Sequence, residues 1–208
     1  MAILRLPVGQ MEANCYLLYD ERTKEALVID PGDEADFIIS KLRDYDLLPK
    51  AVIATHGHFD HVGAVSEIVI AFSLPFMASK LEEPLLKKAQ FSAKHFSGQV
   101  ILPVSPIAVC LKDGDRIPIG SMQLIVIQTP GHTPGGICLY SGKERLLICG
   151  DIIFADGTVG RYDFYYSDKK VLDKSIKRLM NLPNGTVVYP GHGNEFNLGD
   201  WRVVARGD

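Results

Sequence analysis

The chain has 208 residues, of which 47% are hydrophobic and 23% charged, and at this length roughly 70% of the unfolded surface is buried without the help of disulfides. Its formal net charge of −3, with acids and bases mixed along the chain, excludes the basic surface of a nucleic-acid-binding protein and the polybasic patch of a membrane-surface protein. Because no apolar run reaches the ~18 residues of a membrane helix and the N-terminus lacks the apolar stretch of a signal peptide, we expect a single cytoplasmic domain over residues 1–208.

Short apolar runs alternate with helical patterns in the first half of the chain. Turn residues bound the early apolar runs, which predicts strands over 2–8, 15–19 and 25–30. A helix is expected over 33–45, because this segment opens with acids and places Phe37, Ile38 and Leu42 on one face. A buried strand over 51–54 follows, and then helices over 63–72 and near 79–96.

The second half has the same style of pattern. Strands are predicted over 122–129, 136–141, 145–150 and 186–190. A helix over 168–180 has an apolar stripe, and a short helix is expected near Asn194. Strands in both halves with helices among them predict an α/β layered fold.

The cysteines and one histidine are expected to have no role in chemistry. The four cysteines form no CxxC pair and lie in or beside apolar stretches, so we expect buried free thiols at Cys15, Cys110, Cys138 and Cys149. His95 lies in a polar helical segment and is expected at the surface or as a cap.

Three of the six histidines fall in one segment, T-H-G-H-F-D-H at 55–61. It directly follows the predicted strand over 51–54, and strand ends are where open α/β folds place chemistry. Imidazole and carboxylate are good zinc ligands, and two histidines two residues apart on an extended segment point the same way. Crowding prevents all four groups from reaching one tetrahedral ion, so the segment predicts two adjacent metals, held in part by His56, His58, Asp60 and His61.

Two ions need further ligands, and the chain offers three isolated candidates. Each follows a predicted strand and a glycine, which allows a sharp turn and a close approach of the backbone. The polar side chain would then emerge at the rim of a sheet. These candidates are His132 in T-P-G-H-T, Asp151 in C-G-D and His192 in P-G-H-G.

In these motifs the sequence resembles the metallo-β-lactamase superfamily. The matching elements are V-I-D-P-G at 28–32, the segment at 55–61, P-G-H-T at 130–133, G-D at 150–151 and G-H at 191–192, in the family's order. The resemblance implies a four-layer αββα sandwich with a dinuclear site in the groove at the edge of the two sheets. It also implies the ligands: His56, His58 and His132 for one metal, Asp60, His61 and His192 for the other, and Asp151 as the bridge.

The resemblance also implies a supporting role for Asp30, as an aspartate that holds the site without binding metal. A plain turn residue in the Asp-Pro-Gly turn is an equally good interpretation. Two divalent ions are expected, with zinc first and iron or manganese as alternatives, because His and Asp ligands suit all three.

Within the superfamily the chain is most similar to the short glyoxalase II-like thioesterases, the hydroxyacylglutathione hydrolases. The segments P-G-H-T, P-G-H-G and G-D-I-I-F carry this similarity, and G-R-Y-D-F at 160–164 is shared with persulfide dioxygenases. Because the sequence ends soon after His192, we expect no counterpart of the C-terminal helical domain that binds glutathione in full-length glyoxalase II. Ala64 replaces the glycine usual after H-x-D-H-x-G.

We therefore expect a metal-dependent hydrolase that cleaves a small-molecule thioester, such as an S-acylglutathione, with a hydroxide bridging the two metals. Asp60 is the candidate catalytic residue, because its free oxygen would position the hydroxide. A thiolate leaves without needing a proton, because an ordinary thiol pKa is about 8.5. Arg161 is the candidate contact for a substrate carboxylate, although a pairing with Asp163 is at least as good an interpretation. The sequence does not indicate an oligomeric state.

Three alternatives remain open. A persulfide dioxygenase with one iron fits the G-R-Y-D-F element. Another esterase or lactonase of the same fold fits the ligands. A non-enzymatic metal-binding module is the third, although structural zinc sites are usually closed and rich in cysteine.

Overall fold

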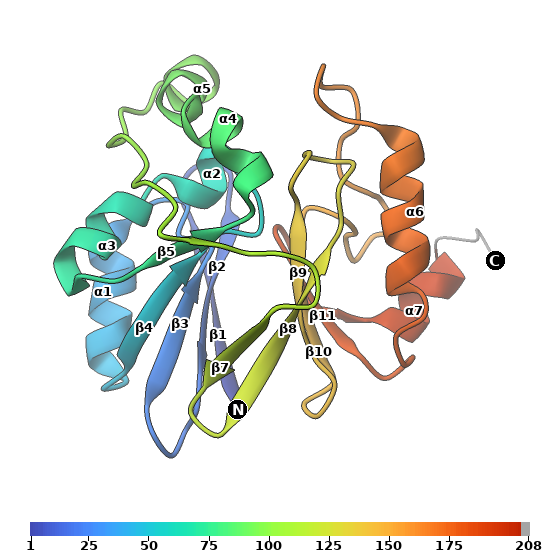
Figure 1. The fold of residues 1–208 in the computed structure, drawn as a ribbon, viewed down its shortest axis with the longest axis horizontal. Coiled ribbons are helices and arrows are strands. Elements are labelled where there is room, and N and C mark those ends of the chain that lie inside the picture. Colours follow the sequence, from blue (N-terminus) through green and yellow to red (C-terminus); the bar gives the residue numbers. More distant parts are fainter. Residues whose placement is uncertain (205–208) are drawn as a thin grey trace.

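Alternating apolar side chains bury both faces of the central strands. In β2 (Ala13–Tyr19) every residue is buried. Cys15 and Leu17 face one apolar cluster, whereas Tyr16 and Leu18 face another. A strand buried on both sides needs a packing layer on each side. The computed structural model, which describes residues 1–204, supplies these layers as a second sheet and a set of helices (Figure 1).

The first sheet has the strand order β1-β2-β3-β4-β5-β6. β1, β2 and β3 pair antiparallel, and β4, β5 and β6 continue parallel to β3. Its strands are β1 (Ala2–Val8), β2, β3 (Glu25–Ile29), β4 (Leu48–Ile53), β5 (Phe76–Ala78) and β6 (Val109–Cys110).

The second sheet has the order β12-β11-β10-β9-β8-β7. All of its pairs are antiparallel except β10 with β11. Its strands are β7 (Arg116–Ile119), β8 (Met122–Gln128), β9 (Ile137–Ser141), β10 (Leu146–Gly150), β11 (Val187–Pro190) and β12 (Phe196–Asn197).

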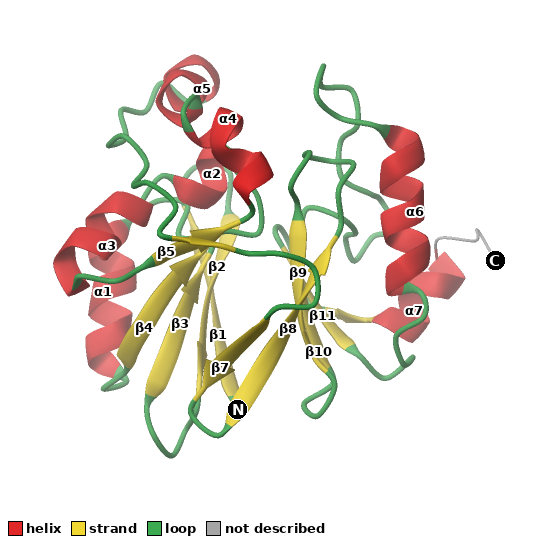
Figure 2. Ribbon diagram, viewed as in Figure 1, coloured by secondary structure: helices red, strands yellow, loops and turns green. Residues whose placement is uncertain are grey.

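The two sheets pack face to face over a shared apolar core, to which Ile29 and Ile53 contribute from the first sheet and Leu124, Leu139 and Ile148 from the second. Helices cover the outer faces, as Figure 2 shows in red. Those on the first sheet are α1 (Ala35–Asp44), α2 (Phe59–Val62), α3 (Val65–Phe72), the 3-10 helix η1 (Lys80–Glu82), α4 (Glu83–Leu86) and α5 (Ala89–Phe96). α6 (Lys169–Leu179) and α7 (Leu198–Val204) cover the second sheet. The four-layer αββα sandwich is thus confirmed.

Two helices on the second sheet show how local sequence sets the elements. The Asp168 side chain accepts a hydrogen bond from the Val171 amide at 3.1 Å and so caps α6, which buries Leu172 and Leu179. On α7, Trp201 is buried, and its indole N–H donates to the Phe154 carbonyl at 2.9 Å. In residues 1–204 no helix has the length and apolar character needed to cross a bilayer.

The structure corrects several expectations drawn from the sequence. The segment 79–96 forms η1, α4 and α5 rather than one helix, and the last helix begins at Leu198 rather than near Asn194. The short strands β5, β6, β7 and β12 were not expected. Phe37 is exposed instead of joining Ile38 and Leu42 in the core. Cys110, on edge strand β6, is exposed, whereas the other three cysteines are buried free thiols as expected.

Candidate metal centre

The predicted ligands follow the ends of four strands and meet at one end of the sandwich. His56 and His58 come after β4, and His132 comes after β8. Asp151 directly follows β10, and His192 follows β11. The first of these strands belongs to the first sheet and the other three to the second. The site therefore exists only where the two sheets meet.

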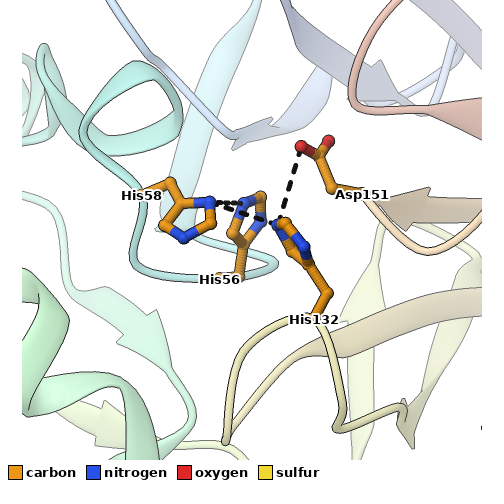
Figure 3. Close-up of side chains that lie close together, drawn as sticks. All are labelled: His56, His58, His132 and Asp151. Carbon is orange, nitrogen blue, oxygen red and sulfur yellow. Dashed lines mark hydrogen bonds and ion pairs between the residues drawn. The ribbon is translucent and has the colours of Figure 1, made fainter. Parts of the chain in front are cut away.

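One group of ligand atoms consists of three histidine nitrogens and a carboxylate oxygen (Figure 3). His58 Nδ1 lies 3.1 Å from His56 Nε2 and 3.2 Å from His132 Nε2. Asp151 Oδ2 lies 3.8 Å from His132 Nε2. A tetrahedral ion with metal–nitrogen distances of 2.0–2.1 Å places its ligand atoms about 3.3 Å apart, so this group fits such an ion.

A second group is formed by Asp60, His61 and His192. His61 Nε2 lies 3.4 Å from His192 Nε2. Asp60 Oδ2 lies 3.4 Å from the same His192 atom and 3.8 Å from His61 Nε2. The spacing again fits one ion, with a carboxylate among the ligands.

Asp151 faces both groups. Its Oδ1 is 3.5 Å from His61 Nε2, and its Oδ2 is 3.7 Å from His192 Nε2. Oδ1 is buried and accepts no hydrogen bond from the described residues, which is costly unless something else satisfies it. A Cβ at Gly191 would lie only 2.0 Å from this oxygen, so a glycine is required there. A carboxylate that faces both sets of ligand atoms and has one unsatisfied oxygen is suited to bridge a pair of cations.

Asp30 holds the rings of two histidines. It is fully buried, with a φ of 52° that aspartate tolerates better than most residues. Its Oδ1 accepts the Thr55 amide at 2.6 Å, and its Oδ2 accepts the Thr55 hydroxyl at 2.7 Å and His61 Nδ1–H at 3.2 Å. The Thr55 hydroxyl oxygen is then free to accept His56 Nδ1–H at 3.0 Å. Both rings therefore hold a proton on Nδ1 and turn Nε2 toward the site.

The other three predicted histidine ligands also have hydrogen-bond partners on the side away from the site. His132 Nδ1–H donates to the Arg161 carbonyl at 2.7 Å, and His192 Nδ1–H donates to the Met11 carbonyl at 3.0 Å. His58 is reversed: its Nδ1 faces the site and its Nε2 lies 2.8 Å from the Tyr166 hydroxyl. Such partners orient a ligating histidine and fix its tautomer.

Arg161 contributes its carbonyl to the site, while its side chain lies outside. The guanidinium donates to both oxygens of Asp163 at 3.0 and 2.8 Å, and both side chains are exposed. A contact between Arg161 and a substrate stays a prediction.

An open pocket of about 400 Å³ lies beside His192 and is lined partly by Phe154 and Asp156.

The charges of the histidines differ between the two groups. Burial, reinforced by neighbouring histidines, lowers the pKa of His56, and it lowers that of His58 to about 3. Burial also acts to lower the pKa of His61, but Asp151, Asp60 and Asp30 outweigh it and raise this pKa to about 10. For Asp60, burial acts to raise the pKa, but His61 and His192 lower it overall. His56 and His58 in the first group are therefore neutral near pH 7, whereas His61 in the second group is an imidazolium.

Three contributors were not identified from the sequence. Thr55 opens the histidine segment, and its position beside H-x-H was the available signal. Tyr166 belongs to a cluster of tyrosines in which spacing cannot distinguish the inward residue. Glu82, discussed below, lies in an apparently ordinary helical segment. His95 is exposed, as expected, and stacks on Phe91 with 6.0 Å between ring centroids.

We predict that binding of metal to the second group releases a proton. His61 is protonated below its pKa of about 10, and a metal can bind its Nε2 only when the proton leaves. Because one proton is released, the apparent metal affinity should rise about tenfold for each unit by which the pH increases, as long as the pH is below that pKa. Zinc titrations of metal-free protein between about pH 6 and 8 should show this rise for one metal and a weaker one for the other. Two affinities with equal pH dependence would contradict the assignment.

We predict that Asp30→Asn weakens the second group of ligands. If the NH₂ group of the asparagine faced His61, it would donate to Nδ1 and favour the wrong tautomer of this ring. If it faced the other way, it would lie against the Thr55 backbone N–H, which is also a donor. We expect about 10–100-fold weaker binding of one metal and a loss of about 1–3 kcal/mol in the free energy of unfolding. Chelator competition and chemical denaturation measure the two effects. The exposed Asp36→Asn on α1 is the control, and equal behaviour of both variants would argue against this role.

Comparison with known proteins finds matches along most of the chain. The family model described as the metallo-beta-lactamase superfamily matches residues 8–192. An uncharacterized protein of Aquifex aeolicus is 39% identical over 205 residues, which cover 98% of this chain and 95% of that protein. The hydroxyacylglutathione hydrolase GloC of Haemophilus influenzae is 31% identical, with 96% of this chain and 94% of that protein covered.

Solved structures give the same result. The B3 metallo-beta-lactamase BLEG-1 superposes with a TM-score of 0.88 at 34% identity, covering 95% of each chain. The di-iron-bound form of TTHA1623 gives 0.86 at 36% identity, covering 94% of this chain and 95% of that one. ETHE1 from Myxococcus xanthus gives 0.80 at 26% identity, covering 99% and 83%.

The match to the family model covers most of the chain, and the His and Asp side chains converge where the two sheets meet. This protein therefore belongs to the metallo-beta-lactamase superfamily.

Proposed function

We propose that this protein is a dinuclear metallo-hydrolase that cleaves thioesters of the S-acylglutathione class in the cytoplasm. The observation that carries the proposal is the pair of ligand groups with Asp151 between them. One buried carboxylate oxygen, which accepts no hydrogen bond from residues 1–204, faces the second group, while the other oxygen faces both. A structural zinc site would be closed and rich in cysteine, whereas this one uses only His and Asp.

Each side chain has a definite part in this proposal. His56, His58 and His132 would hold one ion, Asp60, His61 and His192 would hold the other, and Asp151 would contribute to both. Bound divalent ions supply a Lewis acid for the substrate carbonyl and lower the pKa of water to make a nucleophile. The Asp60 carboxylate, kept ionised by His61 and His192, orients the attacking water. Zinc is the first expectation, and the di-iron form of TTHA1623 supports iron as the alternative.

A thioester is favoured because the Tyr166 hydroxyl, which lies beside His58, is a poor acid for protonating a leaving group. This hydroxyl is hydrogen bonded to His58, and burial, together with Tyr165, raises its pKa to about 12. Such a group is a poor proton donor near neutral pH. A thiolate leaves without protonation, because an ordinary thiol has a pKa of about 8.5, whereas an amine must be protonated. The similarity to the hydroxyacylglutathione hydrolase GloC supports the same substrate class.

The substrate's carboxylate would then bind at Arg161. Its guanidinium is exposed, and Asp163 holds it with the geometry that a carboxylate of the substrate would use. The substrate has only to replace a solvent-exposed partner, and such pairs are weak.

A persulfide dioxygenase with one iron is the second candidate. The G-R-Y-D-F element at 160–164, which resembles an element of persulfide dioxygenases, favours it, and the chain is also similar to ETHE1 from Myxococcus xanthus. The likeness to BLEG-1 keeps β-lactams among the substrates to be tested, and other esters and lactones belong to the same test.

The deciding experiment is elemental analysis of protein purified without added metal, followed by a substrate panel. The panel holds an S-hydroxyacylglutathione, a chromogenic β-lactam, a lactone and glutathione persulfide with an oxygen electrode. Two metals per chain and preferred cleavage of the thioester support the proposal. One iron per chain with oxygen consumption would replace it by the dioxygenase.

We predict that Asp151→Ala loses metal and activity together, because both ions share this carboxylate. Metal content should fall well below two per chain, and thioester kcat/KM should fall by at least about 100-fold. Asp173→Ala, which removes an exposed partner of Lys169 on α6, should leave both values unchanged. Normal hydrolysis by the Asp151 variant would refute the scheme.

A further inference from the structure

A buried carboxylate outside the ligand set connects the two loops that carry the first group of histidines. Glu82, the last residue of η1, is fully buried. Its Oε2 accepts the Gly57 amide at 2.6 Å, and its Oε1 accepts the Gly135 amide at 2.5 Å. The two oxygens of one side chain thus bind two backbone segments that are 78 residues apart in the sequence.

These two amides belong to the metal-binding loops. Gly57 stands between His56 and His58 in the loop that follows β4 of the first sheet. Gly135 follows His132 in the loop between β8 and β9 of the second sheet. The carboxylate therefore sets the distance between a loop of one sheet and a loop of the other.

Packing supports this contact independently of the hydrogen bonds. A Cβ added at Gly57 would lie 3.0 Å from Glu82 Oε2 and 2.9 Å from Leu85 Cβ. A Cβ added at Gly135 would lie 2.9 Å from Glu82 Oε1 and 2.8 Å from Leu81 Cβ. Both loops thus have glycine at the point where the segment 81–85 approaches them, and any side chain would push the loop away.

The energetics argue against a merely space-filling role. Among residues 1–204, none of the ion pairs involves Glu82. Burial raises its pKa, although the Gly135 and Gly57 amides counteract this. A buried carboxylate without a cation is unfavourable unless hydrogen bonds offset the loss of water. The two short bonds that Glu82 accepts from N–H groups are of the strong, charge-assisted kind. An apolar side chain would fill the space but could not hold either amide.

We propose that Glu82 is a positioning residue that fixes the separation of the His58 and His132 loops, and thereby forms the first metal site across the two sheets. In the structure that separation is 3.2 Å between His58 Nδ1 and His132 Nε2. This inference rests on the proposed metal centre but not on the thioester as the substrate.

The test is Glu82→Gln, which preserves shape and volume but has only one acceptor oxygen. One of the two glycine amides must then face an NH₂ group. In metal-free protein, we expect that amide to exchange with solvent about tenfold faster or more, as followed by NMR. Zinc affinity of the first group should fall about 10–100-fold in chelator competition. The neighbouring Glu83→Gln, which affects only an ion pair with Lys80, should change neither quantity.

Gly135→Ala keeps the carboxylate and displaces the loop, so it should weaken zinc binding even if Glu82→Gln fails to fold. Reduced unfolding free energy of Glu82→Gln, with unchanged zinc affinity and unchanged exchange at Gly57 and Gly135, would overturn the inference. A wild-type protein that binds no metal would overturn it as well. If the wild type binds zinc but cleaves no thioester, only the proposed substrate fails, and the exchange and affinity data still decide the role of Glu82.

Discussion

The hydrogen bonds accepted by Asp30 are the constraint on which the candidate centre depends. This carboxylate, at the end of β3, holds the Thr55 backbone, the Thr55 hydroxyl and the His61 ring. Through the hydroxyl it also orients His56. The Thr55 carbonyl accepts the Ile137 amide at 2.9 Å, which fastens the start of β9 to the same residue. One buried acceptor is thus connected to both groups of ligands and to both sheets. The left-handed backbone at Asp30 fits this interpretation, because such conformations persist where the surroundings dictate them.

The division of the ligands between two sheets has a thermodynamic consequence. Each group of ligand atoms contains residues from both halves of the chain, so a bound ion connects segments that are distant in sequence. Further contacts tie the halves together without metal: the Tyr16 hydroxyl donates to the Pro190 carbonyl at 2.6 Å, and the Asn14 side chain donates to the same carbonyl at 2.9 Å. The apolar core between the sheets adds to these. The metal-free protein can therefore hold its ligands close to their bound positions, which reduces the entropy lost when an ion binds.

How much could be predicted from the sequence depended on whether the signal was local. The long apolar strands and the amphipathic helix α6 have their pattern in consecutive residues, and their positions were predicted to within about two residues, except that β4 begins three residues earlier. Strands β5 and β6 have only three and two residues. β5 forms because it pairs with β4, and β6 forms because it pairs with β5. Such short segments carry no pattern of their own. Cys110 lies in an apolar run, and local composition therefore predicted a buried thiol. It is exposed because its strand, β6, is at the edge of the sheet.

The candidate site shows the same division. The seven candidate ligands could be predicted from their residue types and from the strands that precede them, and the structure brings all seven together. Most of the residues that orient them could not. Glu82 lies in a segment of ordinary helical composition, and no local signal shows that its carboxylate turns inward to the two glycine amides. Of the neighbouring tyrosines, only Tyr166 is bonded to His58. These choices depend on contacts between loops that are far apart in sequence, which no spacing rule contains.

The single tryptophan of the chain lies where it can report on the site. The indole of Trp201 is buried and bonded to the Phe154 carbonyl, and the Phe154 ring lies 6.4 Å from that of His192 between centroids. The segment that begins at Asp151 thus connects the Asp151 carboxylate, the predicted bridge, to a natural fluorophore. The emission of the unlabelled protein is therefore an optical signal for movement of this segment, recorded from one indole without interference from any other.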